Sequence, residues 1–508
     1  MDKEKRYCVT SKTMSLPSIL VHLHILLMTA SSVFSYVHFT EENFPGNPDI
    51  SLQKMTLDPT TNTLYVGSVN RLYKLNSDLE EEIHRDTGPV SDHPTCFPPP
   101  GQCTTQEFSR EATNNIIKIL LVDNNRLITC GSVYQGTCQV RSLEDFTPLG
   151  NNTSEEIAAN TRIGTSVGFI SRGPENRANV LYTATSSADW IDNNVPTVSV
   201  RSLPEVIPSR NLFSVLKTGF RAVSQIVIPA ETVSESPNGF NITYVYGFPS
   251  GNFSYFVGVQ PENHRTLPRE VQYYTKLIRI CQRDINLLSY IELPLKCYSG
   301  GVDYNIAQSA YIAKAGKDGG EPWQNEDALF VTFAQSEEHD REPQRKSAVC
   351  MYLVSDLNQA FFDRRRECVN GHQSDTQMEW YKSVPCTEVG KTPALLVERM
   401  DREGRNYCHT LDFIGPMGGT DSPIIAQAIH VDDSTLFTAI AVSHKPQESA
   451  IFVGDDTGHL LKLMLTSQSK ASVSTDHEIV PDGSVVQNGL LLSLDEEYVY
   501  VMTQRQVS

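Results

Sequence analysis

Cysteines are the side chains with the most chemistry to offer in this sequence, which has 11 of them in 508 residues. A cysteine pair can hold a metal, act as a redox switch or form a structural disulfide. Cys96 and Cys103 have six residues between them, and Cys130 and Cys138 have seven. Zinc ligands usually stand about two to four residues apart, and no histidine pair lies near these cysteines. The spacing therefore favours disulfides, with Cys130 and Cys138 joining the two arms of a β-hairpin.

Residues 1–35 are typical of a secretory signal peptide. Basic residues come first, the apolar run LPSILVHLHILLM follows, and the small residues of TASSVFS suit cleavage near Ser32 to Ser35. A signal anchor or a buried helix is the alternative, which the shortness of the apolar run disfavours. No later stretch is long and apolar enough to span a membrane, so we expect an exported product.

Cleavage there would remove Cys8 and leave an even number of cysteines, as a disulfide framework in an oxidising compartment requires. The remaining cysteines are Cys96, Cys103, Cys130, Cys138, Cys281, Cys297, Cys350, Cys368, Cys386 and Cys408. Glycosylation sequons agree with export, although each one alone is a weak signal. They stand at Asn151, Asn152, Asn241 and Asn252, and the overlapping first two leave room for one glycan.

Motifs that suggest catalysis have more ordinary explanations. GTSVG matches the nucleophile elbow around Ser166, but the residues that follow have no helical period, and the elbow needs a helix there. Asp-Thr-Gly occurs at Asp86 and at Asp456, without the apolar residues that precede it in aspartic proteases, so two turns are the better interpretation. The sequence predicts no enzyme, no cofactor and no metal site.

The formal net charge of -18 bears on the class of partner. Nucleic-acid-binding proteins are usually basic, because they displace counterions from phosphates, and an anionic membrane surface would repel this chain. The acidic excess therefore favours a solvated surface that binds protein, and we expect no nucleic-acid partner.

Short strands separated by turns are the elements that must position these residues. TLYVGSVNRLYKL, residues 63–75, alternates apolar and polar side chains on both sides of a turn, and the same shape recurs along the whole chain. Amphipathic helices are scarce, so the chain is expected to be all-β. Recurrent hairpins over so many residues favour the radial repetition of a β-propeller over one large sandwich.

One segment, 356–408, interrupts this pattern and is expected to be a disulfide-tied excursion from the propeller. It includes a predicted helix, SDLNQAFFDRRREC, capped by Ser355 or Asp356. The apolar face of this helix would comprise Leu357, Ala360 and Phe361. Its run DRRREC is interpreted as a solvated helix face, with a processing or heparin-binding site as the alternative.

Two predicted loops carry the side chains best suited to bind a partner. SSADWIDNNVPT contains Asp189 and Trp190, and LKTGFRAV contains Phe220 and Arg221. Loops on rigid blades often bind partners, and aromatic and arginine side chains are enriched in binding hot spots. The alternative is that Trp190 packs beneath its own loop and that Phe220 begins a strand.

Long stretches of the chain resemble, in order, the sema domain as it occurs in plexins. They include LDPTTNTLYVGSVNRLYKLNSDL (57–79), YVYGFPSGNFSYFVGVQP (244–261) and TAIAVSHKPQESAIFVGDDTGHLLKL (438–463). The similarity spans nearly all of 36–508. It implies that these residues form a seven-bladed propeller with an inserted excursion.

The resemblance also implies a disulfide pairing that the sequence alone leaves open. The implied pairs are Cys96 with Cys103, Cys130 with Cys138, Cys281 with Cys408, Cys297 with Cys350, and Cys368 with Cys386.

In function, the resemblance implies the extracellular semaphorin-binding module of a plexin-like cell-surface receptor, as used in the guidance of cells or axons. A co-receptor and self-association stay open, and so does the plexin class. The chain would be secreted as written, or the plasma-membrane ectodomain of a receptor of which it is a fragment. Plexins continue beyond this domain into a membrane span and a GTPase-activating region, whose activity is not assigned to these residues.

Two other functions stay open as alternatives. A semaphorin-like secreted ligand also carries a sema propeller, but LYVGSVNRLYKL and CGSVYQGTC resemble the receptor form. A secreted hydrolase is the remote alternative. Binding to semaphorins or to plexin ectodomains separates the first two, and generic ester and peptide substrates test the third.

Overall fold

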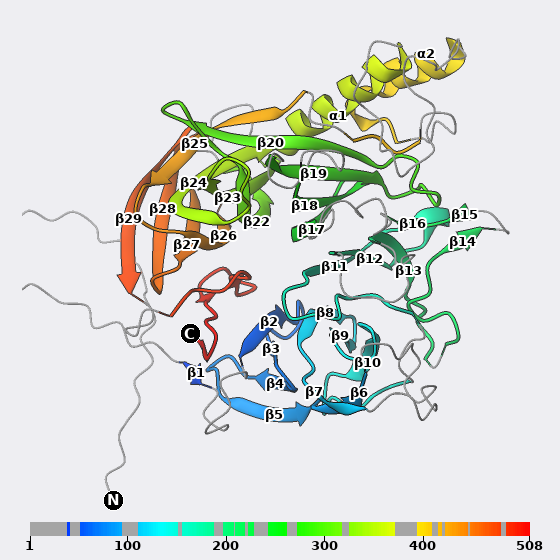
Figure 1. Cartoon of the computed structure of the whole chain (residues 1–508), viewed down its shortest axis with the longest axis vertical. Coiled ribbons are helices and arrows are strands. Elements are labelled where there is room, and N and C mark those ends of the chain that lie inside the picture. The colour runs from blue at the N-terminus through cyan, green and yellow to red at the C-terminus, as the bar shows by residue number, and fades with distance from the viewer. Residues whose placement is uncertain are drawn as a thin grey trace, which may run out of the picture.

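The computed structural model describes most of the chain between residues 38 and 508. The described ranges are 38–40, 51–93, 110–150, 155–186, 197–207, 209–218, 222–227, 242–261, 272–316, 325–370, 394–408, 415–418, 422–445, 448–478 and 484–508. The predicted signal segment 1–35 lies outside them. Small sheets follow one another around an axis, and the chain passes round this ring from blue to red (Figure 1).

The first three blades are small antiparallel sheets, whose strands are rich in the β-branched and aromatic residues that favour a pleated, half-buried surface. The first blade has the order β2-β3-β4-β5, the second β10-β9-β8 and the third β11-β12-β13-β16. Their strands are β2 (Leu52–Leu57), β3 (Leu64–Ser68), β4 (Arg71–Leu75), β5 (Glu81–Asp86), β8 (Ile117–Asp123), β9 (Arg126–Gly131), β10 (Cys138–Ser142), β11 (Ser166–Ser171), β12 (Val180–Thr185), β13 (Val198–Ser202) and β16 (Gln225–Ile226). Beside them lie two short pairs and a 3-10 turn: β6 (Val90–Asp92) with β7 (Glu111–Thr113), β14 (Lys217–Thr218) with β15 (Ala222–Val223), and η1 (Pro174–Asn176).

The next two blades are fused into one nine-stranded sheet. Its strands are β17 (Thr243–Ser250), β18 (Phe253–Pro261), β19 (Tyr273–Cys281), β20 (Ile291–Ser299), β21 (Val302–Tyr304), β22 (Ile306–Lys314), β23 (Asp327–Ser336), β24 (Pro343–Leu353) and β25 (Ile424–Asp432). Strand β25 joins the blades, because its first residues pair in parallel with β20 and its last residues pair antiparallel with β24.

The last two blades close the ring. They are built from β26 (Phe437–Lys445), β27 (Glu448–Asp455), β28 (His459–Ser467), β29 (Lys470–Glu478), β30 (Leu491–Leu492) and β31 (Val499–Tyr500), with β1 (Phe39–Thr40) and β32 (Gln506–Val507) completing the closure. Phe39 pairs with Val507, so the two ends of the described chain meet in one sheet. The prediction of an all-β, seven-bladed propeller is confirmed.

Five of the innermost strands, but not β11, share a local irregularity near their first residues. Register shifts occur at Leu52/Lys54, Ile117/Ile119, Tyr244/Tyr246, Ala307/Ser309 and Phe437/Ala439. A bulge bends its strand and re-aims a side chain. In two of these blades, the strand that pairs with the bulged strand carries a glycine. A larger residue would not fit there, because a side chain of the neighbouring blade lies against its Cα. A Cβ on Gly67 would lie 2.8 Å from Ile117, and one on Gly454 would lie 2.3 Å from Val486.

The predicted excursion leaves the ring between β24 and β25. It contains α1 (Val354–Val369), α2 (Ala394–Glu403) and η5 (Gly404–Asn406). The apolar face of α1 is confirmed, since Leu357 and Phe361 are fully buried. The predicted cap is wrong: the helix follows Leu353 and has no side-chain cap. Instead, the carboxylate of Glu326 accepts the Ser355 N–H at 2.9 Å and takes over the role of a cap.

The prediction of a solvated face for DRRREC holds for Asp363, Arg366 and Glu367, which are exposed, but is wrong for its other two arginines. Arg364 and Arg365 are only 2% and 3% exposed, because α1 packs them against the ring. Arg365 Nη2 donates to the carbonyl of Ser289 over 3.1 Å. Burial lowers the pKa of Arg365, and the nearby carboxylate of Asp284 opposes that shift. Arg365 thereby anchors the excursion to the segment that leads into β20 of the fused sheet.

A buried ion pair lies inside the fused sheet. Lys276 Nζ is 3.0 Å from Glu292 Oε2, and both side chains are at most 3% exposed. Tyr290 donates to Glu292 Oε1 over 3.2 Å, and the Gln260 amide contacts the same carboxylate. Buried charges are tolerated when they are paired and hydrogen-bonded, as they are here.

Candidate functional site

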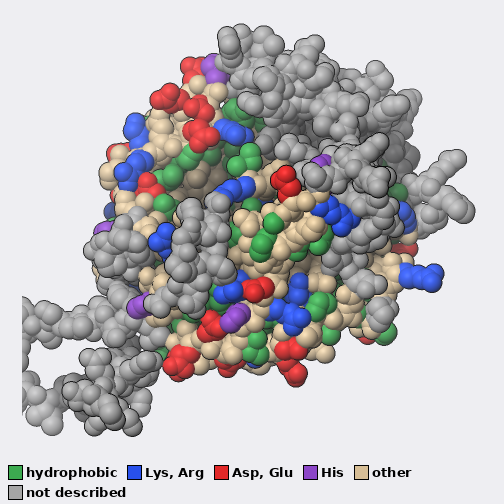
Figure 2. Space-filling model, turned by 60° about the horizontal axis from the view of Figure 1, so that its bottom comes forward, with side chains coloured by type: hydrophobic (Ala, Val, Ile, Leu, Met, Phe, Trp, Pro, Cys, Tyr) green, Lys and Arg blue, Asp and Glu red, His purple; other side chains and the backbone are tan. Residues whose placement is uncertain are grey.

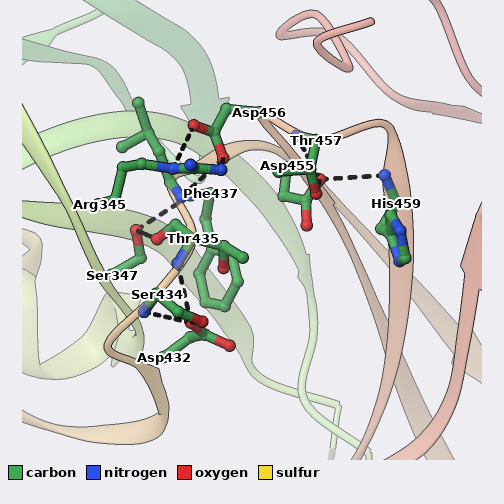
Figure 3. A network of polar contacts seen from close by, with 11 residues as sticks. Arg345, Ser347, Asp432, Ser434, Thr435, Phe437, Asp455, Asp456, Thr457 and His459 are labelled. Carbon is green, nitrogen blue, oxygen red and sulfur yellow. Dashed lines mark hydrogen bonds and ion pairs between the residues drawn. The ribbon is translucent and has the colours of Figure 1, made fainter. Parts of the chain in front are cut away.

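A network of polar contacts joins two blades where β25 leads into β26 and where β27 turns into β28 (Figure 3). Arg345, near the start of β24, supplies the cation. Its Nε lies 2.9 Å from Asp456 Oδ2, and its Nη2 donates to Asp456 Oδ1 over 3.1 Å. The same carboxylate accepts the Leu436 N–H at 3.0 Å. A guanidinium fork suits this two-pronged contact, which fixes the β25–β26 connection against the β27–β28 turn.

Ser347 ties the same connection to β24. Its hydroxyl donates to the Thr435 carbonyl and accepts the Phe437 N–H, both over 3.0 Å. One side chain thus satisfies two backbone groups of this connection. The connection between the blades is therefore held from both sides, by Ser347 and by Asp456.

Two further aspartates shape the turns themselves. Asp432 Oδ1 accepts N–H groups from Ser434 and Thr435, at 2.7 and 2.9 Å. Burial raises the pKa of Asp432, but these hydrogen bonds outweigh burial and place the pKa below its ordinary value. Asp455 Oδ1 likewise accepts the N–H groups of Thr457 and His459, at 2.8 and 3.0 Å. Both carboxylates are engaged by their own turns, which makes them structural groups.

This arrangement suits recognition better than catalysis. The five side chains that build it already have hydrogen-bond partners, and they hold the backbone of these loops in place. Rigid loops on a scaffold bind partners at a lower entropic cost than mobile ones. In the described part of the face shown in Figure 2, basic, acidic and apolar side chains are interleaved.

A cavity of about 350 Å³ opens near the propeller axis, between the first residues of β17 and β22 and the segment around Asn488. Its polar lining includes Thr165, Gln308 and Arg341, and its rim carries Ile163, which is 82% exposed. Gln308 is the extra residue of the bulge in β22. The bulge therefore helps to shape the end of the axis.

The described residues contain three of the expected disulfides. They are Cys130–Cys138, Cys281–Cys408 and Cys297–Cys350. The first joins paired residues of β9 and β10, as the hairpin interpretation predicts. Cys368 is also disulfide-bonded. Its expected partner Cys386 lies outside the described residues, as do Cys96 and Cys103.

The remaining predicted site residues fall mostly outside the described ranges. These are Asn151, Asn152 and Asn241 among the sequons, and Asp189, Trp190, Phe220 and Arg221 among the binding residues. Asn252 is described: it is exposed in the turn between β17 and β18. Sequence reasoning did not single out Arg345 or Ser347, although the Asp-Asp-Thr-Gly turn that contacts Arg345 was visible.

The motifs that suggested catalysis have structural roles. Ser166 is the first residue of β11, and its buried hydroxyl accepts the Ala159 N–H at 2.9 Å. Asp86 pairs with Arg71 at the end of β5, and Asp456 pairs with Arg345. Among the described residues, no cluster of histidine, cysteine or acidic side chains is arranged to hold a metal. In the same part of the chain, no helix has the length and hydrophobicity of a membrane span.

Comparison with known proteins finds similarity to the sema domain and to plexins. A family described as "Sema domain" matches residues 307–493. Plexin-A4 from Mus musculus and from Homo sapiens are each 32% identical over 477 residues, covering 92% of this chain and 24% of the relative. This chain therefore spans about a quarter of the length of these relatives.

Solved structures of plexins and semaphorins are also similar to this chain. A structure of the full extracellular region of plexin A4 superposes with a TM-score of 0.80 and 31% identity. The alignment covers 93% of this chain and 51% of the plexin A4 chain. Drosophila Semaphorin 2a has the same fold, at a TM-score of 0.62 and 14% identity. The similarity in sequence and structure to plexins, over more than nine-tenths of the chain, identifies it as a member of the plexin family, represented by its sema domain.

Proposed function

We propose that this chain is the extracellular, semaphorin-binding module of a plexin-type receptor in semaphorin–plexin signalling. The observation that carries the proposal is the match to the plexin A4 extracellular region over 93% of the chain. A similar fold occurs in a structure of Drosophila Plexin A in complex with Semaphorin 1b, at a TM-score of 0.56 and 13% identity. The disulfide between ring and excursion, Cys281–Cys408, suits an oxidising, extracellular setting.

In this proposal residues 1–35 direct export and 36–508 form the binding module, either secreted or as the ectodomain of a plasma-membrane receptor. The module acts by recognition and has no catalytic centre. Asp189, Trp190, Phe220 and Arg221 remain the proposed contacts on the partner. A co-receptor and self-association are compatible with this role, and the oligomeric state in solution tests the second.

A binding screen tests the proposal. The purified chain is passed over immobilised semaphorin ectodomains and plexin ectodomains, and binding is followed by surface plasmon resonance. Capture of at least one semaphorin supports the receptor role. Capture of plexin ectodomains alone would instead assign the chain to the ligand side. Turnover of ester or peptide substrates above background would contradict a purely binding function.

Variants locate the contact. Phe220→Asp and Trp190→Ala are expected to abolish or strongly weaken semaphorin capture while secretion persists. Tyr498→Ala is the matched control, because it also removes an aromatic side chain, here one that is 55% exposed on another part of the ring. Unchanged affinity in Phe220→Asp removes this loop from the proposed site.

A further inference from the structure

Two lysines lie on contacting innermost strands of neighbouring blades, near enough for the charge of Lys54 to act on Lys118. Lys118 is the extra residue of the bulge in β8, and it is 7% exposed. Its Nζ donates to the carbonyls of Arg162 and Gly164, over 2.9 and 2.8 Å. A lysine ammonium has three N–H donors, so one donor of Lys118 remains for another acceptor.

Lys54 approaches from β2. It is paired in register with Gly67, whose bare Cα lets Ile117 of the next blade come into contact. Lys54 is partly accessible, so a small ion can reach it. Within the described residues, its ammonium has no hydrogen bond and no ion pair. Enclosed charges are normally paired, because the protein interior solvates an ion poorly.

The surroundings of the two lysines lower the pKa of both side chains. Burial lowers the pKa of Lys54. Burial also lowers the pKa of Lys118, and the charges of Lys54 and Arg162 lower it further, to about 8. The two carbonyl acceptors favour the charged form of Lys118, but the charged groups that act on it, Lys54 and Arg162, are both cations and disfavour that form. In a chain with a net charge of -18, two neighbouring lysines without a carboxylate partner among the described residues are unexpected.

We propose that Lys54 and Lys118 form a binding site for a small oxyanion, of the sulfate or phosphate class, near the propeller axis. An oxyanion would accept the free N–H donors of both ammoniums and supply the missing negative charge. Compact ammonium groups suit a tetrahedral anion as point charges. Binding would also cross-link β2 and β8, and thus stabilise the contact between the first two blades.

Thermal unfolding and calorimetry of the whole purified chain test this site. Sodium sulfate and sodium phosphate are titrated against sodium chloride at constant ionic strength. One equivalent of sulfate or phosphate is expected to bind and to raise the melting temperature above its value in chloride. Binding is expected to weaken as the pH rises above about 8, because Lys118 then loses its proton. Equal melting temperatures in all three salts, without calorimetric binding, would overturn the proposal.

Variants separate a site from a general salt effect. Lys54→Met is expected to weaken binding by about tenfold or more, and Lys54→Arg to retain it. Lys470→Met is the control, since it removes the same charge from an exposed position on β29. In oxyanion-free buffer Lys54→Met should melt at or above the temperature of the unmodified chain, because it removes an uncompensated charge. Oxyanion binding by Lys54→Met that equals binding by Lys470→Met contradicts the proposal.

Discussion

The fused pair of blades and the closure of the ring show two ways of joining sheets. In the fused pair, β25 hydrogen-bonds to the outer strands of both blades, and Cys297–Cys350 connects β20 to β24 beside it. At the closure, β1 and β32 pair through only two residues each, and β30 and β31 do the same. The first joint is continuous and covalent, whereas the second depends mainly on side-chain packing.

The two joints are expected to tolerate different kinds of change. A continuous sheet with disulfides distributes a local defect over many strands. A closure built from short strands depends on the fit of a few buried side chains, among them Val486, Met502 and Val507, which are fully buried. We therefore expect covalent and ionic changes to matter most in the fused pair, and changes of packing to matter most at the closure.

The largest effect is expected from the disulfide that ties the excursion to the fused pair. The double variant Cys281→Ser with Cys408→Ser removes a disulfide that spans 127 residues of sequence. The chain-entropy model predicts that the free energy of unfolding falls by about 5 kcal/mol. The matched control, Cys130→Ser with Cys138→Ser, removes a disulfide that spans 8 residues, and the same model predicts a loss of about 2.5 kcal/mol. Urea unfolding measures both free energies. Equal losses in the two double variants would contradict the prediction that Cys281–Cys408 stabilises the fold more than Cys130–Cys138.

The buried ion pair gives the next largest effect. Lys276→Met leaves the Glu292 carboxylate buried without its cation, and we expect a loss of about 3–5 kcal/mol in the free energy of unfolding. The double variant Lys276→Met with Glu292→Leu removes both charges and should recover most of that loss. Unfolding in urea distinguishes the two. A single variant as stable as the double variant would show that leaving Glu292 without its cation is not the source of the loss.

A glycine near the closure compares packing in the two regions. Gly454→Ala places a Cβ 2.3 Å from Val486 Cγ1, so the neighbouring segment must move, at a cost of about 1–3 kcal/mol. Gly258→Ala, in the fused pair, meets its nearest atom at 3.2 Å and should cost less. Melting temperatures rank the two variants. If Gly258→Ala melts lower, packing is not tighter near the closure.

The smallest effect is expected from the exposed pair between Arg345 and Asp456. Arg345→Ala should cost less than about 1 kcal/mol, because solvent screens a pair whose arginine is 55% exposed. Amide hydrogen exchange at Leu436 should nevertheless increase, since Asp456 would lose the cation that orients its carboxylate. Unchanged exchange at Leu436 would mean that Ser347 alone holds the connection.

Local sequence was enough to predict the strands, because alternation within LYVGSVNRLYKL is a property of neighbouring residues. It could not predict the two partners of β25, since β20 lies far earlier in the chain and no local pattern encodes a parallel pairing across an insertion. The burial of Arg364 and Arg365 was missed for a related reason. Charge runs predict exposure unless another element covers them, and here that element is the fused pair.

For the candidate site, sequence identified the Asp-Asp-Thr-Gly turn but not its cation. Arg345 comes from β24, on the neighbouring blade, so only the ring brings it to Asp456. The pairing of Cys281 with Cys408 came from family resemblance, because spacing alone cannot select one pairing among many. The loops with Trp190 and Phe220 remain predictions, since they lie outside the described residues.

The return of β25 after the excursion also sets an order of events during synthesis. Strand β24 is complete at Leu353, but β25 begins only at Ile424. At an elongation rate of about 5–20 residues per second, the edge of β24 waits several seconds on the ribosome for its partner. An open edge of this kind recruits other strands, including those of neighbouring nascent chains. The most extensive sheet of the folded protein is thus the one that most needs chaperone protection while the chain is being made.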